Sequence, residues 1–262
     1  MSGDTGSILD DLGQLFFEVH KDLPREGPGS TASTRRALDV IKPFLPESPR
    51  VVDVGCGPGA QTLVLASELP HAQITAIDLH EPFLAQLRDL AVKRQVGDRI
   101  DTVCADMGKW SPILSGKAEP VDLVWCEGAA YFIGIANALG KWSSWLKPGG
   151  FVAFTEPVWL TDAPSPRTLA MWEEYSELAD PAACLALTEQ CGYQVLGSFV
   201  LPQSDWLDEY YAPMQQRIDG LRTKHADDAR AMSELDVHQE EIDVCREYGA
   251  EYGYLFVMAR TT

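Results

Sequence analysis

A strand-like run that ends in three alternating glycines is the feature that most constrains this chain. Val51-Val52-Asp53-Val54 leads into Gly55-Cys56-Gly57-Pro58-Gly59-Ala60, and a helix-like segment follows at residues 61–69. Glycine adopts backbone conformations closed to other residues, and it lets a ligand approach bare backbone amides at a helix start. The run therefore predicts a strand, a tight turn and a helix that together bind a nucleoside cofactor; the alternative is a tight turn without a ligand.

The glycine run alone leaves the cofactor open. Gly55-x-Gly57-x-x-Ala60 also satisfies the loose dinucleotide fingerprint, so it fits a nicotinamide enzyme as well as an S-adenosylmethionine enzyme. Further signals must come from the strands that follow, because open α/β sheets bind their ligands at the carboxyl ends of the strands.

Acidic residues follow the next predicted strands at this edge. Residues 73–78 end in Asp78, a candidate acceptor for both ribose hydroxyls, which either cofactor would require. Residues 100–104 lead to Asp106 and Met107, where a carboxylate and neighbouring backbone suit the adenine amino group and ring nitrogen. Residues 121–126 form a fourth strand that opens at Glu127, and residues 147–154 turn into a fifth. The Asp106 feature favours a methyltransferase.

The segments DVGCGPG, AIDL, ADM and LKPGG, in this order and spacing, resemble the class I S-adenosylmethionine-dependent methyltransferases. The likeness is strongest to the enzymes similar to those of ubiquinone and menaquinone biosynthesis, and it covers roughly residues 50–157. Outside these bounds, residues 25–30, 127–131 and 251–254 resemble a little-characterised bacterial subgroup of small-molecule methyltransferases. The resemblance implies S-adenosylmethionine as cofactor and S-adenosylhomocysteine as product; it leaves the acceptor unnamed.

The expected cofactor contacts lie in the segments that carry the resemblance. They are Gly29, Ser30, Asp53, Gly55, Gly57, Gly59, Gln61, Asp78, Leu79, Asp106, Met107 and Glu127. Several have a plainer alternative role. Asp53 either orients the loop and approaches the methionine amino group or simply binds loop amides. Asp106 competes with a helix N-cap. The loop at residues 26–30 either folds over the methionine moiety or is only a linker.

Glu127 and Tyr131 are the catalytic candidates. Glu127 follows the fourth strand, so its backbone is expected beside the sulfonium and its side chain within reach of an amine. A general-base role would require desolvation, and a loop carboxylate that binds backbone amides is the alternative. Tyr131 is expected to line the same pocket. His20 is expected on a helix surface and is left out of the catalytic set.

An aromatic and acidic set in the later part of the chain predicts a substrate chamber that would suit a cation through ring-face attraction. Its members are Glu156, Trp159, Trp206, Tyr210 and Tyr211. Ordinary aromatic packing is the alternative for all five.

Composition narrows the partners. The net charge of −18 and the absence of any basic run disfavour a nucleic-acid substrate and an anionic membrane surface. Six cysteines without a CxxC pair are expected to be buried, reduced residues, and neither they nor the five histidines suggest a metal site. No segment resembles a signal peptide or a membrane span, so a cytoplasmic protein is expected. A homodimer remains open.

The pattern of elements predicts one α/β domain over residues 1–262, with a Rossmann-like doubly wound sheet. Seven strands are expected, mostly parallel with one antiparallel member near the end. Residues 1–49 are expected to form an N-terminal helical cap with helices at 7–20 and 34–44, residues 50–157 the cofactor core, and residues 158–262 the substrate-side insertions and closing strands. Core helices are expected at 59–69, 81–94 and 130–145, and later ones at 181–191 and within 205–248.

The leading function from sequence is methyl transfer from S-adenosylmethionine to a small molecule by in-line displacement. An NAD(P)-dependent oxidoreductase is the second possibility, disfavoured because no Tyr-x-x-x-Lys pair follows the fourth strand and Asp106 would be unexplained. A catalytically silent S-adenosylmethionine-binding protein is the third.

Overall fold

The computed structural model describes residues 13–112, 119–173, 175 and 178–262. Its centre is a seven-stranded sheet in the order β3-β2-β1-β4-β5-β7-β6. The strands are β1 (Arg50–Val54), β2 (Gln73–Asp78), β3 (Ile100–Cys104), β4 (Val121–Cys126), β5 (Leu146–Trp159), β6 (Tyr193–Val200) and β7 (Tyr252–Thr261). All neighbouring pairs are parallel except those of β7, which runs antiparallel to both β5 and β6. The predicted strand number and the single antiparallel member are confirmed.

Helices cover both faces of this sheet. The face with α3 (Thr31–Ile41), α4 (Ala60–Glu68) and α5 (Glu81–Lys93) buries one apolar cluster, and the face with α6 (Ile135–Ser143) and α8 (Pro181–Gln190) buries another. Strand side chains alternate between the two clusters, as a strand with two buried faces requires: Val51 belongs to the first and Val52 to the second. The doubly wound fold that the sequence predicts is confirmed.

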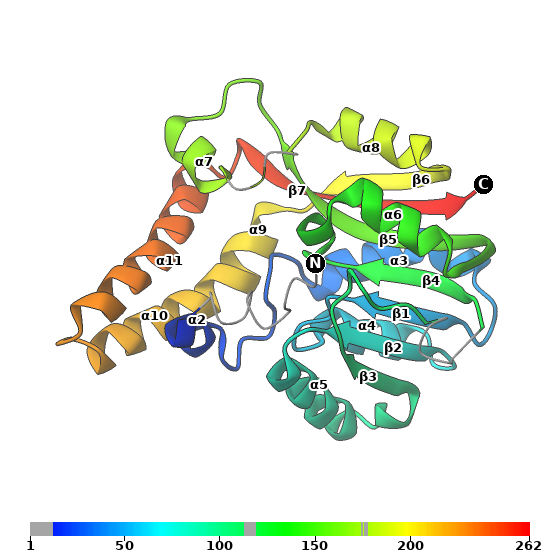
Figure 1. Cartoon of the computed structure of the whole chain (residues 1–262), viewed down its shortest axis with the longest axis horizontal. Helices are drawn as coiled ribbons and strands as arrows, with labels where there is room; N and C mark the ends of the chain where they lie inside the picture. Colours follow the sequence, from blue (N-terminus) through cyan, green and yellow to red (C-terminus); the bar gives the residue numbers. More distant parts are fainter. Residues whose placement is uncertain (1–12, 113–118, 174, 176–177) are drawn as a thin grey trace.

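A helical group lies beyond the carboxyl ends of the parallel strands. It comprises α2 (Gly13–His20), α9 (Gln203–Trp206), the π-helical turn η4 (Leu207–Tyr211), α10 (Ala212–Lys224) and α11 (Ala229–Tyr248). Helix α2 packs on α10 and α11, and α7 (Pro166–Met171) also contacts α11. In Figure 1 the arrow of β7 points away from this group, so the parallel strands point toward it. We call this group the cap.

Two helices differ from the sequence expectation at their ends. Helix α3 begins at Thr31 rather than residue 34, because the Ser30 hydroxyl accepts a hydrogen bond from the Ser33 amide (3.1 Å) and so caps the helix. A 3-10 turn, η1 (Lys42–Phe44), continues it. The predicted helix at 130–145 is interrupted: a 3-10 turn, η3 (Ala130–Ile133), ends at Gly134, and α6 starts after it. The predicted helix at 7–20 is described only over α2, because residues 1–12 lie outside the described range.

Strand β5 is longer than the predicted residues 147–154. It extends to Trp159 because β7 pairs with it continuously from Phe151 to Trp159. Another 3-10 turn, η2 (Gly97–Arg99), precedes β3.

Four of the six cysteines are buried and Cys191 is half-buried, but Cys104 is exposed, so the expectation that the cysteines are buried is wrong for this one. Cys104 closes β3, which lies at an edge of the sheet. None of the described helices is long and apolar enough to cross a membrane.

Candidate active site

The glycine loop after β1 is shaped by close neighbours on all sides. Gly55 has φ +67°, and a Cβ placed there would lie 2.4 Å from the Cβ of Ala129, in the loop after β4. A side chain is therefore excluded both by the backbone conformation and by the contact. Gly57 has φ +52°, and a Cβ there would lie 3.3 Å from Cγ of Glu26. Glu26 thus packs against the loop, and the segment at residues 25–30 lies next to it.

Asp53 and Gln61 connect the loop to helix α4 through side-chain hydrogen bonds. Asp53 is fully buried at the end of β1 and accepts hydrogen bonds from the Thr62 hydroxyl (2.5 Å) and from Nε2 of Gln61 (3.4 Å). Gln61 also donates to the carbonyl of Cys56 (3.1 Å). Burial raises the pKa of Asp53 to about 7, although the bond from Thr62 opposes the shift. In this structure Asp53 therefore holds helix α4 against the loop through side chains.

Asp78, at the tip of β2, joins the loop to the next turn. Its Oδ2 accepts from the Gly57 amide (2.8 Å) and its Oδ1 from the His80 amide (2.9 Å). Burial raises the pKa of Asp78, and these amide bonds oppose the shift. Leu79 beside it is half-buried, and His80 stacks on Phe17 of α2 with ring centroids 4.4 Å apart. The cap therefore reaches the rim of the predicted ribose and adenine site.

Glu26 lies opposite Asp78 across the glycine loop. Burial raises the pKa of Glu26 to about 9, with a further contribution from the negative charge of Asp78. Its Oε2 lies 2.6 Å from Nδ1 of His20, whereas its buried Oε1 has no hydrogen-bond partner among the described residues. Burial lowers the pKa of His20 to about 4, so burial disfavours the charged form of both partners. His20 is only 4% exposed, so the expectation of a helix-surface histidine is wrong: α2 turns it inward.

Glu127 is the most fully bonded carboxylate of the site. Its Oε2 accepts from Nη1 of Arg25 (2.9 Å), and its Oε1 accepts from the Thr34 hydroxyl (2.7 Å) and from Nε1 of Trp125 (2.9 Å). Arg25 also reaches the Thr34 hydroxyl (3.3 Å). The side chains of Arg25 and Glu127 are 7% and 3% exposed, so this is a buried ion pair between the segment at residues 25–30 and the end of β4. The sequence motifs contained both residues but gave no sign that they meet.

Gly29 and Ser30 lie between this ion pair and the cap. A Cβ at Gly29 would come within 2.6 Å of Arg25 Nη1, so the glycine makes room for the guanidinium. The Gly29 amide donates to the carbonyl of Asp205 in α9 (3.3 Å), and the Ser33 hydroxyl donates to the Asp205 carboxylate (2.5 Å). Residues 25–30 are thus tied at both ends, to β4 and to α9.

The remaining predicted contacts lie at the next strand ends. Asp106 Oδ1 accepts from the Gly108 amide (2.8 Å) and its Oδ2 lies 3.3 Å from the Lys109 ammonium, while Met107 is half-buried. Tyr131 lies in η3, with its ring centroid 4.8 Å from that of Tyr175. Burial raises the pKa of Tyr131 well above its usual value, and Tyr254 and Tyr175 add to the shift.

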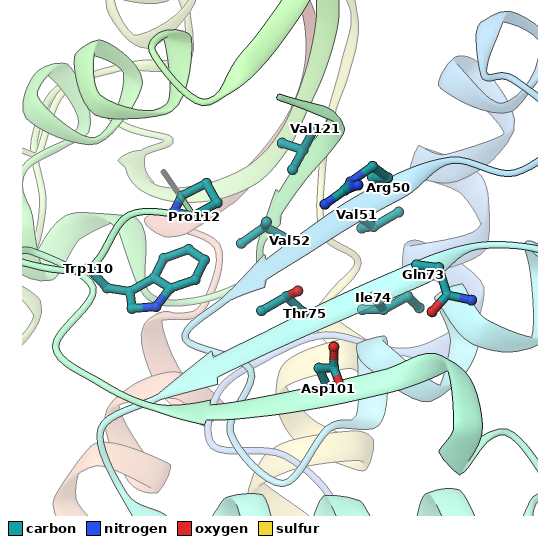
Figure 2. Close-up of a pocket in the computed structure, with 10 residues that line it drawn as sticks. All are labelled: Arg50, Val51, Val52, Gln73, Ile74, Thr75, Asp101, Trp110, Pro112 and Val121. Carbon is teal, nitrogen blue, oxygen red and sulfur yellow. The ribbon is translucent and has the colours of Figure 1, made fainter. Parts of the chain in front are cut away.

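A separate cavity of about 220 Å³ lies at the amino-terminal ends of the strands, opposite the predicted site (Figure 2). Its lining comes from the amino-terminal parts of β1, β2, β3 and β4 together with Trp110 and Pro112. It holds none of the predicted site residues, so we do not assign the chemistry to it. In the described part of the chain, no group of three histidine, cysteine or acidic residues is placed to hold a metal ion.

Comparison with known proteins agrees with this geometry. Residues 51–150 match the family model of a methyltransferase domain. A trans-aconitate 2-methyltransferase of Streptomyces avermitilis is 35% identical over 146 residues, which are 53% of this chain and 51% of that protein. One from Azoarcus sp. is 29% identical over 207 residues, 77% of this chain and 72% of that protein. The chain spans about half the length, or less, of the first two curated relatives it matches.

A solved structure extends the comparison to the whole fold. A methyltransferase from Geobacter sulfurreducens, in complex with S-adenosyl-L-homocysteine, superposes with a TM-score of 0.82 at 21% identity, over 95% of this chain and 98% of that one. The resemblance predicted from the sequence is confirmed: the chain is similar to S-adenosylmethionine-dependent methyltransferases and has the fold of this one.

Proposed function

We propose that this protein transfers a methyl group from S-adenosylmethionine to a small-molecule acceptor by in-line displacement. The family of the domain and the relatives named above support the reaction. The acceptor site would be formed by the cap together with the ends of β4, β5 and β7. We propose further that residues 1–262 act as one cytoplasmic domain, without nucleic-acid partners, and that a homodimer is compatible with this function.

The observation that carries the proposal is the acidic pair at the glycine loop. Asp78 accepts one amide on each oxygen, which leaves a lone pair on each for a ribose hydroxyl. Glu26 Oε1 is buried without a partner in the described residues, a costly condition that a hydroxyl donor would relieve. The residues present therefore fit an adenosyl group.

The roles of the chain's own residues follow from this fit. When bound, the cofactor supplies an electrophilic methyl group on a sulfonium. Gly55 and Gly57 let the adenosyl group lie against the loop, Asp78 and Glu26 receive the ribose, and Asp106 and Met107 are expected to meet the adenine. Gly29 and Ser30 are expected near the methionine carboxylate, at the start of α3. Alignment at attack distance and exclusion of water are the main tasks left to the protein, worth several kcal/mol in favourable cases.

Glu127 suits an anchoring role better than a proton-accepting one. A general base needs a free lone pair directed at its substrate, whereas both oxygens of Glu127 already accept hydrogen bonds and one faces Arg25. We propose that Glu127 holds residues 25–30 over the cofactor through Arg25. Tyr131 would line the acceptor side as a neutral hydrogen-bonding group, since its pKa is raised.

The first test is calorimetry of the purified protein with S-adenosylhomocysteine and, separately, with NADH. Binding of the former and not the latter is expected; the reverse would reject the methyltransferase and favour an oxidoreductase. A metabolite screen for S-adenosylhomocysteine release then separates an enzyme from a silent binder, which would bind the cofactor yet turn over with no metabolite. Trans-aconitate belongs in that screen because of the relatives.

The role of Glu127 is tested with Glu127→Gln once an acceptor is known. The amide keeps an oxygen for Thr34 and Trp125 but loses the charge that faces Arg25, so weaker cofactor binding with preserved turnover at saturation is expected. Loss of turnover at saturating cofactor would restore the general-base role.

A further inference from the structure

Four tyrosines from separate segments come together next to the loop after β4. They are Tyr131 in η3, Tyr175 after α7, Tyr210 in η4 and Tyr254 in β7. A series of ring contacts joins them: Tyr131 lies on Tyr175 with centroids 4.8 Å apart, and Tyr175 contacts Trp172, which contacts Tyr252. Tyr252 and Tyr254 both contact Trp206, which also lies near Tyr211, the neighbour of Tyr210. The ring centroids of Trp206 and Tyr254 are 4.8 Å apart. We call these four residues the tyrosine cluster.

Carboxyl groups face the tyrosine cluster from three directions. Glu241 of α11 and Glu26 both raise the pKa of Tyr210, and Glu241 and Glu156 of β5 raise that of Tyr254. Glu241 accepts a hydrogen bond from the Tyr211 hydroxyl (2.8 Å), and burial raises its own pKa. His20 lowers the pKa of Glu241, against the larger effect of burial.

An unsatisfied hydroxyl points to a ligand at this cluster. Tyr252 is 2% exposed, and its hydroxyl is buried without a hydrogen-bond partner among the described residues, with only the weakly interacting Cys245 thiol beside it. Glu241 and Tyr254 both act on this phenol. A buried hydroxyl without a partner is costly, so a polar group is expected to reach it.

The cluster adjoins the methyl-donor side of the proposed site. A Cβ at Gly128, directly after Glu127, would lie 3.6 Å from Cε2 of Tyr254. Glu26, which raises the pKa of Tyr210, also lies beside the glycine loop, where its Cγ would be 3.3 Å from a Cβ at Gly57. A molecule among the four rings would therefore face the bound cofactor.

We propose that the methyl acceptor is an organic cation, an amine that is protonated in solution, held by the ring faces of the tyrosine cluster and by Glu156 and Glu241. The proposal rests on the methyltransferase function above. Aromatic faces attract ammonium groups by their quadrupole, and nearby carboxylates add direct attraction. A polycarboxylate would meet these same groups with repulsion, which distinguishes this protein from an enzyme for an anionic acceptor.

The chemistry of such an acceptor balances with the groups present. The ammonium first loses one proton to the carboxylate of Glu156 or Glu241, which passes it to water. The freed nitrogen lone pair then forms the N–C bond while the S–C bond breaks, and the electron pair of the S–C bond stays on sulfur. The products are an N-methylammonium ion and neutral S-adenosylhomocysteine, so the positive charge of the sulfonium moves to the amine.

The test is calorimetry on protein saturated with S-adenosylhomocysteine, using two cations and their uncharged counterparts. Choline is paired with 3,3-dimethylbutan-1-ol, phenethylamine with 2-phenylethanol, and trans-aconitate is the anionic probe. At least one cation is expected to bind at least about 10-fold more tightly than its neutral partner, and trans-aconitate is expected to bind more weakly than either cation. Equal affinity within both pairs, no binding of either cation, or tighter binding of trans-aconitate would overturn the proposal.

Variants on helix α11 locate the binding. Glu241→Gln is expected to weaken binding of the cation by about 10-fold while S-adenosylhomocysteine affinity is kept. Glu240→Gln, its exposed neighbour paired with Arg167, is the matched control and is expected to change neither. An equal loss in both variants, or none in Glu241→Gln, contradicts the proposal. Failure of the unaltered protein to bind S-adenosylhomocysteine at all would instead reject the proposed function itself.

Discussion

The proposed site has a donor side, at the glycine loop, and a cap side, at the tyrosine cluster, and the two are built from different kinds of sequence segment. On the donor side, Asp78 accepts the Gly57 amide of the glycine loop and Asp53 accepts the Thr62 hydroxyl, and both carboxylates belong to the strands β2 and β1. On the cap side, the tyrosine cluster and Glu241 come from segments far apart in the chain. The donor side is therefore encoded in short contiguous motifs, whereas the cap side is assembled only when distant segments fold together. The buried pair of Arg25 and Glu127 is one direct joint between residues 25–30, which contact the cap, and the end of β4.

The largest effect is expected from breaking that joint. Arg25→Ala would leave Glu127 buried without its cation, which typically costs about 3–5 kcal/mol in the free energy of unfolding. Urea denaturation measures it. The control is Arg35→Ala, which removes an exposed pair with Glu68 and should cost at most about 1 kcal/mol. Equal losses in the two variants would mean that the two sides are not held together through Arg25.

A smaller loss should follow on the donor side alone. Gly55→Ala places a methyl group 2.4 Å from Ala129 and forces a side chain into positive φ, so the loop must shift. We expect S-adenosylhomocysteine to bind about 30-fold more weakly by calorimetry, equivalent to about 2 kcal/mol. Gly140→Ala, in α6, serves as the control because no atom of the described residues beyond its own helix lies within 4 Å of its added Cβ. Unchanged affinity in Gly55→Ala would argue against the loop as the cofactor site.

The pH dependence of stability distinguishes Glu26 from its surroundings. Its folded pKa of about 9 exceeds the ordinary value of 4.5, so the folded state binds the extra proton and Glu26 makes stability fall as pH rises between these values. His20, lowered to about 4, has the opposite slope up to its ordinary 6.5. The effect of Glu26 is therefore clearest between pH 6.5 and 9, at no more than about 1.4 kcal/mol per pH unit.

Glu26→Gln should flatten that decline when the free energy of unfolding is followed from pH 6.5 to 9. Glu47→Gln, on an exposed stretch, should leave the profile as it is. An unchanged slope in Glu26→Gln would show that its carboxyl group is already ionised at neutral pH.

The smallest effect should fall on the cap side. Tyr211→Phe removes the hydroxyl that donates to Glu241 and is expected to cost about 1 kcal/mol of stability. S-adenosylhomocysteine affinity should stay the same in calorimetry, because no donor-side contact changes. A clear loss of cofactor affinity would show that the two sides are coupled through α11.

The same division explains what the sequence could predict. The seven strands and the glycine loop follow from contiguous patterns, and Asp78 was placed at a strand tip by its position after residues 73–77. The buried position of His20 was missed because Phe16, Glu26 and His238 enclose it from three segments. Arg25 and Glu127 are separated by 102 positions, and no local pattern reveals such a pair. The interruption of the predicted helix at Gly134 could have been predicted, because a glycine lies within residues 130–145.

The place of β7 has a consequence for how the molecule assembles. Strand β6 touches the sheet only through β7, and Phe151 of β5 pairs with Arg260, far along the chain. Loops of this length close slowly, so we expect folding to be limited by the arrival of this strand between its two neighbours. Until then β5 presents an unpaired edge, and a second chain in the same state offers the missing strand. Refolding at high protein concentration should therefore favour exchanged dimers over monomers.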